Sequence, residues 1–63
     1  MSRHGQVWEG PIDSSRAEIH LVLWPSIFDE NAEKHETVKL NTGEASQLLM
    51  KDIENDDRWR RLA

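Results

Sequence analysis

The sequence predicts a small α+β domain, in which a C-terminal helix packs on one face of an antiparallel sheet of two or three strands. Three observations predict this fold. Apolar and polar residues alternate at Arg16–Trp24 and again at Thr37–Asn41, and an apolar stripe at helical spacing follows them. We expect residues 1–63 to form one domain with a thin core, because a chain this short buries only about 60% of its unfolded surface.

The clearest strand is expected at Arg16–Trp24. One of its faces carries a series of apolar residues, namely Ala17, Ile19, Leu21 and Leu23. The other face is polar at its start and apolar at its end, where Val22 and Trp24 lie. We therefore expect the first face to form the core and something further to cover Val22 and Trp24.

The flanking segments are less regular. A short edge strand is expected at Gln6–Glu9, because the turn signal Gly10-Pro11 follows it closely. Ser26–Glu36 fits either a helical turn, started by the acidic capping box at its first residues, or a solvated loop. At Thr37–Asn41, Val38 and Leu40 are expected to point towards the core.

A C-terminal helix is predicted after Asn41 or Thr42, each of which is a suitable N-cap, and Glu44 completes a capping box with Asn41. Its apolar stripe consists of Ala45, Leu48, Leu49 and Ile53. This stripe is expected to pack against the core face of the sheet, made of Ile19, Leu21, Leu23, Val38 and Leu40.

Two carboxylates, Asp52 and Asp56, fall in the middle of this stripe. Burying them would be costly, so a break near Glu54-Asn55 is the cheaper arrangement. A second short helix would then carry Trp59 and Leu62.

The composition excludes several classes of protein. The chain has 12 acidic and 8 basic residues, a formal charge of −4, which argues against a nonspecific nucleic-acid binder or an anionic membrane surface as partner. It has no cysteine, so disulfides and thiolate zinc sites are excluded. Because Met1–Gln6 lacks the apolar run of a signal peptide and Leu21–Trp24 is too short to span a membrane, we expect a cytoplasmic protein.

No constellation for catalysis or metal binding is evident. The carboxylates of Glu9 and Asp13, or of Asp52 and Asp56, lack a phosphate loop, a nucleophile or a cysteine beside them. The three histidines, His4, His20 and His35, show no ligand spacing, although three imidazoles can hold zinc. We therefore expect neither enzymatic activity nor a cofactor.

Tryptophan and arginine indicate a protein partner instead, because both are enriched in binding hot spots. The chain has three tryptophans, and Trp59 lies within the run Arg58-Trp59-Arg60-Arg61. The alternative for Trp59 is that it fixes the helix to the sheet. Clusters of acids, at Asp29–Glu36 and Asp52–Asp57, are suited to docking a basic surface. The predicted partner-binding residues are Trp24, Trp59, Arg58, Arg61, Asp52 and Asp56.

The function expected from these features is that of a small acidic interaction module, an inhibitor, adaptor or accessory subunit, that binds a protein and forms a homodimer if its exposed strands pair. The alternative is a DNA-binding regulator or antitoxin-like protein. Thr37–Asn41 followed by a helix resembles a ribbon-helix-helix repressor. The resemblance implies that the outward residues of this strand read the major groove of DNA. The resemblance covers only the last third of the chain, where acidic and basic residues cancel.

Overall fold

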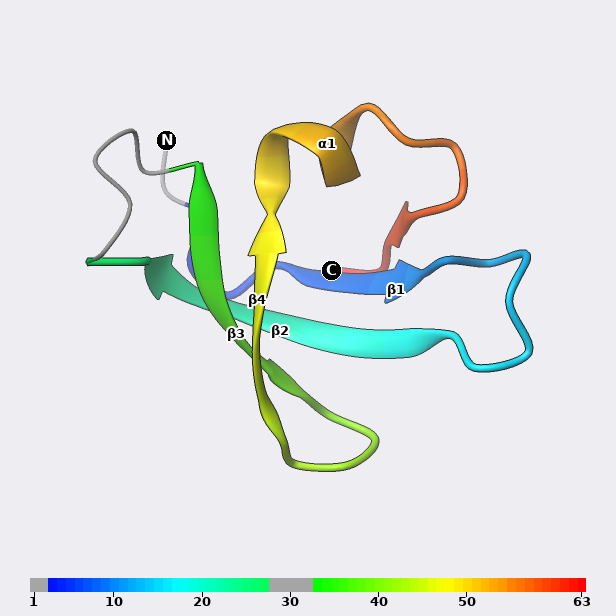
Figure 1. The fold of residues 1–63 in the computed structure, drawn as a ribbon, viewed down its shortest axis with the longest axis horizontal. Coiled ribbons are helices and arrows are strands. Elements are labelled where there is room, and N and C mark those ends of the chain that lie inside the picture. The colour runs from blue at the N-terminus through cyan, green and yellow to red at the C-terminus, as the bar shows by residue number, and fades with distance from the viewer. Residues whose placement is uncertain (1–2, 28–32) are drawn as a thin grey trace.

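A strongly bent antiparallel sheet makes up most of the fold. The computed structural model describes residues 3–27 and 33–63. The elements in chain order are β1 (Val7–Gly10), β2 (Glu18–Pro25), β3 (Lys34–Lys39), β4 (Ala45–Leu49), α1 (Met50–Glu54) and β5 (Arg60–Arg61). The five strands lie in the order β4-β3-β2-β1-β5, so the last strand returns to pair with the first. In Figure 1, β3 and β4 run at a steep angle to β1, and α1 lies beyond the end of β4.

The predicted α+β fold, with two or three strands and a packed C-terminal helix, is wrong. Residues 45–49 form β4 instead of the first turns of a helix, and α1 has only five residues. The reason lies in the alternation of side chains at this point. Leu48 and Met50 are buried while Gln47 is exposed, a period of two that suits a strand and leaves no continuous helical face. The helix ends at Glu54, and β5 takes the place of the second helix.

The strand boundaries also differ from the predictions. β1 overlaps the strand expected at Gln6–Glu9, but it lies between β2 and β5 and is not an edge strand. β3 begins at Lys34 rather than Thr37, and Leu40 lies exposed in the turn that follows. Of the segment Ser26–Glu36, expected to be a helical turn or a loop, residues 34–36 instead belong to β3, and residues 28–32 lie outside the described part of the chain.

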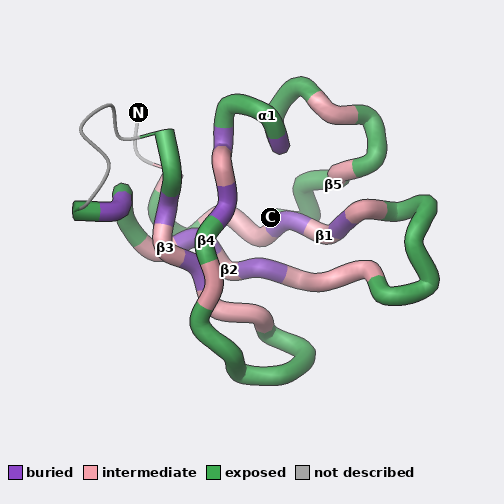
Figure 2. The backbone as a smooth tube through the Cα atoms, viewed as in Figure 1, coloured by how far each residue is buried: buried purple, intermediate pink, exposed green. Residues whose placement is uncertain are grey.

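The sheet buries the face opposite to the predicted one. The core contains Trp8, Val22, Leu48, Met50 and Ile53, with Trp59 packed against it, and four buried polar residues, His20, Ser26, His35 and Thr37. Trp8 pairs with His20 across β1 and β2, and Val22 pairs with Thr37 across β2 and β3. Figure 2 shows buried stretches along β1 to β4 and at the end of α1. Ile19, Leu21 and Val38, which the sequence assigns to the core, therefore lie on the outer face.

A β-bulge in β2 turns Trp24 away from the core. The register between β2 and β3 shifts between Val22 and Trp24, so Leu23 is the extra residue. Because an extra residue reverses the alternation, Val22 points inward and Trp24 outward. Val22 is 0% exposed and Trp24 is 54% exposed. The two residues expected to share one face lie on opposite faces.

The C-terminal segment is fixed to the sheet through Trp59. Its indole lies against Gly10 so closely that a Cβ at Gly10 would come within 2.5 Å of the Trp59 Cδ2 atom. Backbone hydrogen bonds hold the same segment on both sides, from Ile12 N to Arg58 O at 2.6 Å and from Leu62 N to Val7 O at 2.7 Å. Glycine at position 10 is thus required by close approach.

We predict that Gly10→Ala lowers the free energy of unfolding by about 1–3 kcal/mol, because the added methyl group displaces the Trp59 indole. Urea denaturation followed by circular dichroism measures this. In a Trp59→Ala background the same substitution should have little effect, as a double-mutant cycle would show. An equal loss in both backgrounds would mean that the indole is not the obstacle.

Candidate functional site

The outer face of the sheet carries an unbroken apolar row. Val7 pairs with Leu21, Leu21 with Val38, and Val38 with Ala45, so the row crosses all strands from β1 to β4. We call these four residues the outer row. The first three are half-buried and Ala45 is exposed. Since the buried side chains lie on the other face, nothing in the described part of the chain packs over this row as a second layer.

A groove adjoins the outer row at the end of β2. It has a volume of about 290 Å³ and is lined by Leu23, Trp24, Ile27, Glu36, Thr37 and Ala45. We call it the Trp24 groove. Trp24 is 54% and Ile27 is 85% exposed, so two large apolar side chains of the groove lining are open to solvent. Trp24 is the register partner of Glu36, whose carboxylate accepts a hydrogen bond from Gln47 Nε2 at 2.8 Å.

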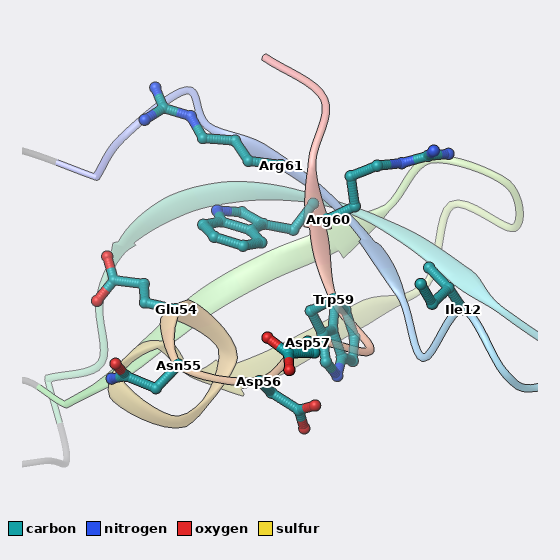
Figure 3. Close-up of a pocket in the computed structure, with 9 residues that line it drawn as sticks. Ile12, Glu54, Asn55, Asp56, Asp57, Trp59, Arg60 and Arg61 are labelled. Atoms are coloured by element: carbon teal, nitrogen blue, oxygen red, sulfur yellow. The ribbon is translucent and has the colours of Figure 1, made fainter.

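A second hollow, the C-terminal cleft, lies between α1 and the ends of β1 and β5. It has a volume of about 660 Å³ and is lined by Trp8, Ile12, Glu54, Asn55, Asp56, Asp57, Trp59, Arg60 and Arg61. Figure 3 shows Asp57 beside the Trp59 indole, whereas Arg60 and Arg61 extend away from each other.

Most charges around the C-terminal cleft are neutralised within the chain. Arg3 donates two hydrogen bonds to Glu54, both at 2.9 Å, and these lower the pKa of the Glu54 carboxyl. Arg58 binds Asp56 in the same bidentate way, at 3.1 and 2.9 Å, which likewise lowers the pKa of Asp56. These pairs close turns and fix the ends of the chain, so they offer little free charge to a ligand.

A chain of polar contacts surrounds the buried His20. Its Nε2 lies 3.1 Å from Glu18 Oε1 and its Nδ1 lies 2.8 Å from Thr37 Oγ1. An ionised carboxylate can only accept, so Nε2 donates to Glu18, while Nδ1 is hydrogen-bonded to the Thr37 hydroxyl. Lys39 Nζ, at 2.6 Å from Glu18 Oε2, completes the chain. The hydrogen bond from Lys39 is the largest cause of the lowered pKa of Glu18, and the hydrogen bond from His20 is the second.

The other buried histidine is not satisfied in this way. His35 is 3% exposed, and its Nδ1 has no hydrogen-bond partner among the described residues. Within those residues no group of His, Asp and Glu side chains is arranged to hold a metal ion. His35 therefore places an unpaired polar atom in the core.

The predicted partner-binding residues fall into separate places. Trp59, Asp56 and Arg61 line the C-terminal cleft, with Arg58 bound to Asp56. Trp24 lies in the Trp24 groove, and Asp52 is exposed on α1 without lining either hollow. Trp59 packs against the core, and its ring centroid lies 5.7 Å from that of His20. These contacts give Trp59 a structural role, although it attaches the C-terminal segment to the sheet and not a helix.

Sequence reasoning did not single out the outer row or the apolar neighbours of Trp24. The relevant signal was present, because Ile19, Leu21 and Leu23 are apolar without interruption on one side of β2. That signal marks an apolar face but does not say whether the chain itself or a partner covers it.

The chain was compared with models of protein families, with curated proteins and with solved structures, and none gives a significant match. None of the helices among residues 3–27 and 33–63 has the length and apolar character needed to cross a lipid bilayer.

We predict opposite effects for the two buried histidines. His20→Leu should lower the free energy of unfolding by about 1–3 kcal/mol, because it leaves the buried Thr37 hydroxyl without its partner. His35→Leu should leave stability unchanged or raise it by about 1 kcal/mol, because it removes an unpaired polar atom. Urea denaturation at neutral pH compares the two variants. A larger loss for His35→Leu would contradict the assignment.

We also predict that Glu18 makes stability dependent on acid. Its pKa is lower in the folded protein than the ordinary value of 4.5, so its contribution is present above pH 4.5 and is lost as the pH falls through the folded-state pKa. Glu18→Gln should lower the free energy of unfolding at pH 7. It should also weaken the fall of the free energy of unfolding with decreasing pH, which urea denaturation at a series of pH values measures. The control is Asp57→Asn, an exposed carboxylate, which should leave the curve nearly unchanged.

Proposed function

We propose that this chain is a small interaction module that binds a partner protein through the outer face of its sheet. The observation that carries the proposal is the distribution of side chains between the two faces. Polar His20, His35 and Thr37 are buried, while the apolar outer row and Trp24 face outward. A sheet that is apolar on its outer side is expected to be covered there.

The chemistry of the surface supports protein over other partners. Aromatic and aliphatic side chains make up the centre of protein interfaces, with polar groups around them. The outer row and the Trp24 groove have this composition, with Glu36 and Gln47 at the rim. The net charge of −4 opposes binding to phosphate backbones. The absence of cysteine is in keeping with action in the cytoplasm, as an inhibitor, an adaptor or an accessory subunit.

Affinity capture from a lysate of the source organism, with and without nuclease, tests the proposal. We expect one stoichiometric protein that resists nuclease and is lost with Trp24→Ala, because that substitution removes the largest exposed apolar side chain of the outer face. The captured protein is then purified and its binding to wild type and variant measured by calorimetry.

The matched control is Ile12→Ala, since Ile12 is 52% exposed, like Trp24, but lines the C-terminal cleft. This variant should retain the partner. Capture that is lost with Ile12→Ala and retained with Trp24→Ala would move the interface to the C-terminal cleft. Capture of nucleic acid alone would replace the proposal with the DNA-binding regulator.

A further inference from the structure

The outer edge of β4 has unpaired backbone groups. The hydrogen bonds from Met50 N to Glu33 O and from Lys39 N to Glu44 O fix the pairing of β4 with β3. Because bonding alternates along an antiparallel pair, the even-numbered residues of β4 bond to β3. The N–H and C=O groups of Ala45 and Gln47 and the N–H of Leu49 therefore point away from the sheet, where no described strand pairs with them, whereas the C=O of Leu49, the N-cap of α1, begins the helix.

This edge opens directly onto the Trp24 groove. Ala45 belongs to both, and the register places Trp24, Glu36 and Gln47 side by side on β2, β3 and β4. An added strand would continue this row with a residue opposite Gln47. Two strand spacings, about 9.6 Å, would separate that residue from Glu36, a distance that two long side chains extended towards each other can span.

Glu36 is the charged residue in the lining of this groove. Glu18, Glu54 and Asp56 each have a cationic partner within the chain. The hydrogen bond that Glu36 accepts comes from a neutral amide, and no described cation forms an ion pair with it. The groove is thus apolar with one uncompensated negative charge, and the side chain that complements it is cationic.

We infer that the occupant of the Trp24 groove is an extended segment of the partner protein that adds to β4 as a sixth strand and places an arginine on Glu36. The backbone of such a segment bonds to the free groups of Ala45 and Gln47 and to the N–H of Leu49. Arginine fits better than lysine, because its planar guanidinium binds a carboxylate in two places and stacks on an indole, here that of Trp24.

A second copy of the chain is a poorer occupant of the same edge. The segment that would pair with itself, Ala45–Leu49, has no cation to place on Glu36. Two copies with a charge of −4 each also repel one another. The inference rests on the proposed function and specifies the partner at that surface.

A displayed library of random ten-residue peptides, selected in parallel against wild type and Glu36→Arg, tests the inference. Wild type should select arginine flanked by alternating apolar residues, and Glu36→Arg should select aspartate or glutamate at the same place. Synthetic copies of the wild-type peptides should bind roughly tenfold to a hundredfold more weakly to Glu36→Gln, as expected for loss of a charge-assisted pair. N-methylation of the peptide backbone should abolish binding.

Glu36→Gln preserves the shape of the side chain, and its melting curve, together with that of Trp24→Ala, verifies that the variants fold. Peptides without arginine, or binding that is unchanged by Glu36→Gln, would overturn the inference. A dimer in sedimentation equilibrium that dissociates with Trp24→Ala would overturn it in favour of a second copy. If the peptide experiments fail but capture of a partner protein still depends on Trp24, the proposed interaction module is retained. Only the inference of an added strand with an arginine on Glu36 is then rejected.

Discussion

The burial of His20 is the constraint on which the rest of the structure depends. An imidazole inside a core is costly when its ring nitrogens lack hydrogen-bond partners. Glu18 on the same strand and Thr37 on the next supply them, so β2 and β3 must pair in the register that brings Thr37 beside His20. This choice places Val22 in the core and commits Leu21 to the outer face, because adjacent residues of a strand point to opposite sides.

The remaining elements complete a core that is both small and partly polar. Trp59 covers His20 from the C-terminal segment, and its indole fits because Gly10 has no side chain. The ion pairs of Arg3 with Glu54 and of Arg58 with Asp56 hold the segments that surround it. The C-terminal cleft is accordingly explained by what keeps a short chain folded, even though it is the larger of the two hollows and is lined by three of the six residues predicted to bind a partner.

The sequence predicted the two main strands and the end of α1, but not the architecture. Alternation at Arg16–Trp24 identified β2, yet alternation has two phases, and the more apolar phase was assigned to the core. The assignment failed because His20 is made acceptable inside by its hydrogen bonds to Glu18 and to Thr37 on the next strand, which the alternation of apolar and polar residues does not reveal. The stripe from Ala45 to Ile53 fits a helix as well as a strand followed by one turn, and pairing with β3 decides between them. For the candidate site, Trp24 was found from composition, whereas the bulge at Leu23 and the free edge of β4 exist only in the folded chain.

The sheet buries polar residues and places apolar residues on its outer face, and this arrangement connects the stability of the domain with its proposed function. A chain of 63 residues has few large apolar side chains. Three of them, Leu21, Val38 and Trp24, lie on the outer face and so do not contribute to a core that is already small. Folding alone gives no reason for this, since exchanging polar interior groups for apolar ones tends to stabilise a domain. The proposed binding of a partner over the outer face would provide the reason, because the apolar surface would then contribute to binding instead of folding. Under the same proposal, the uncompensated carboxylate of Glu36 at the margin of that surface would add discrimination, since an apolar face by itself attracts many partners and a buried unpaired charge rejects those that lack a cation.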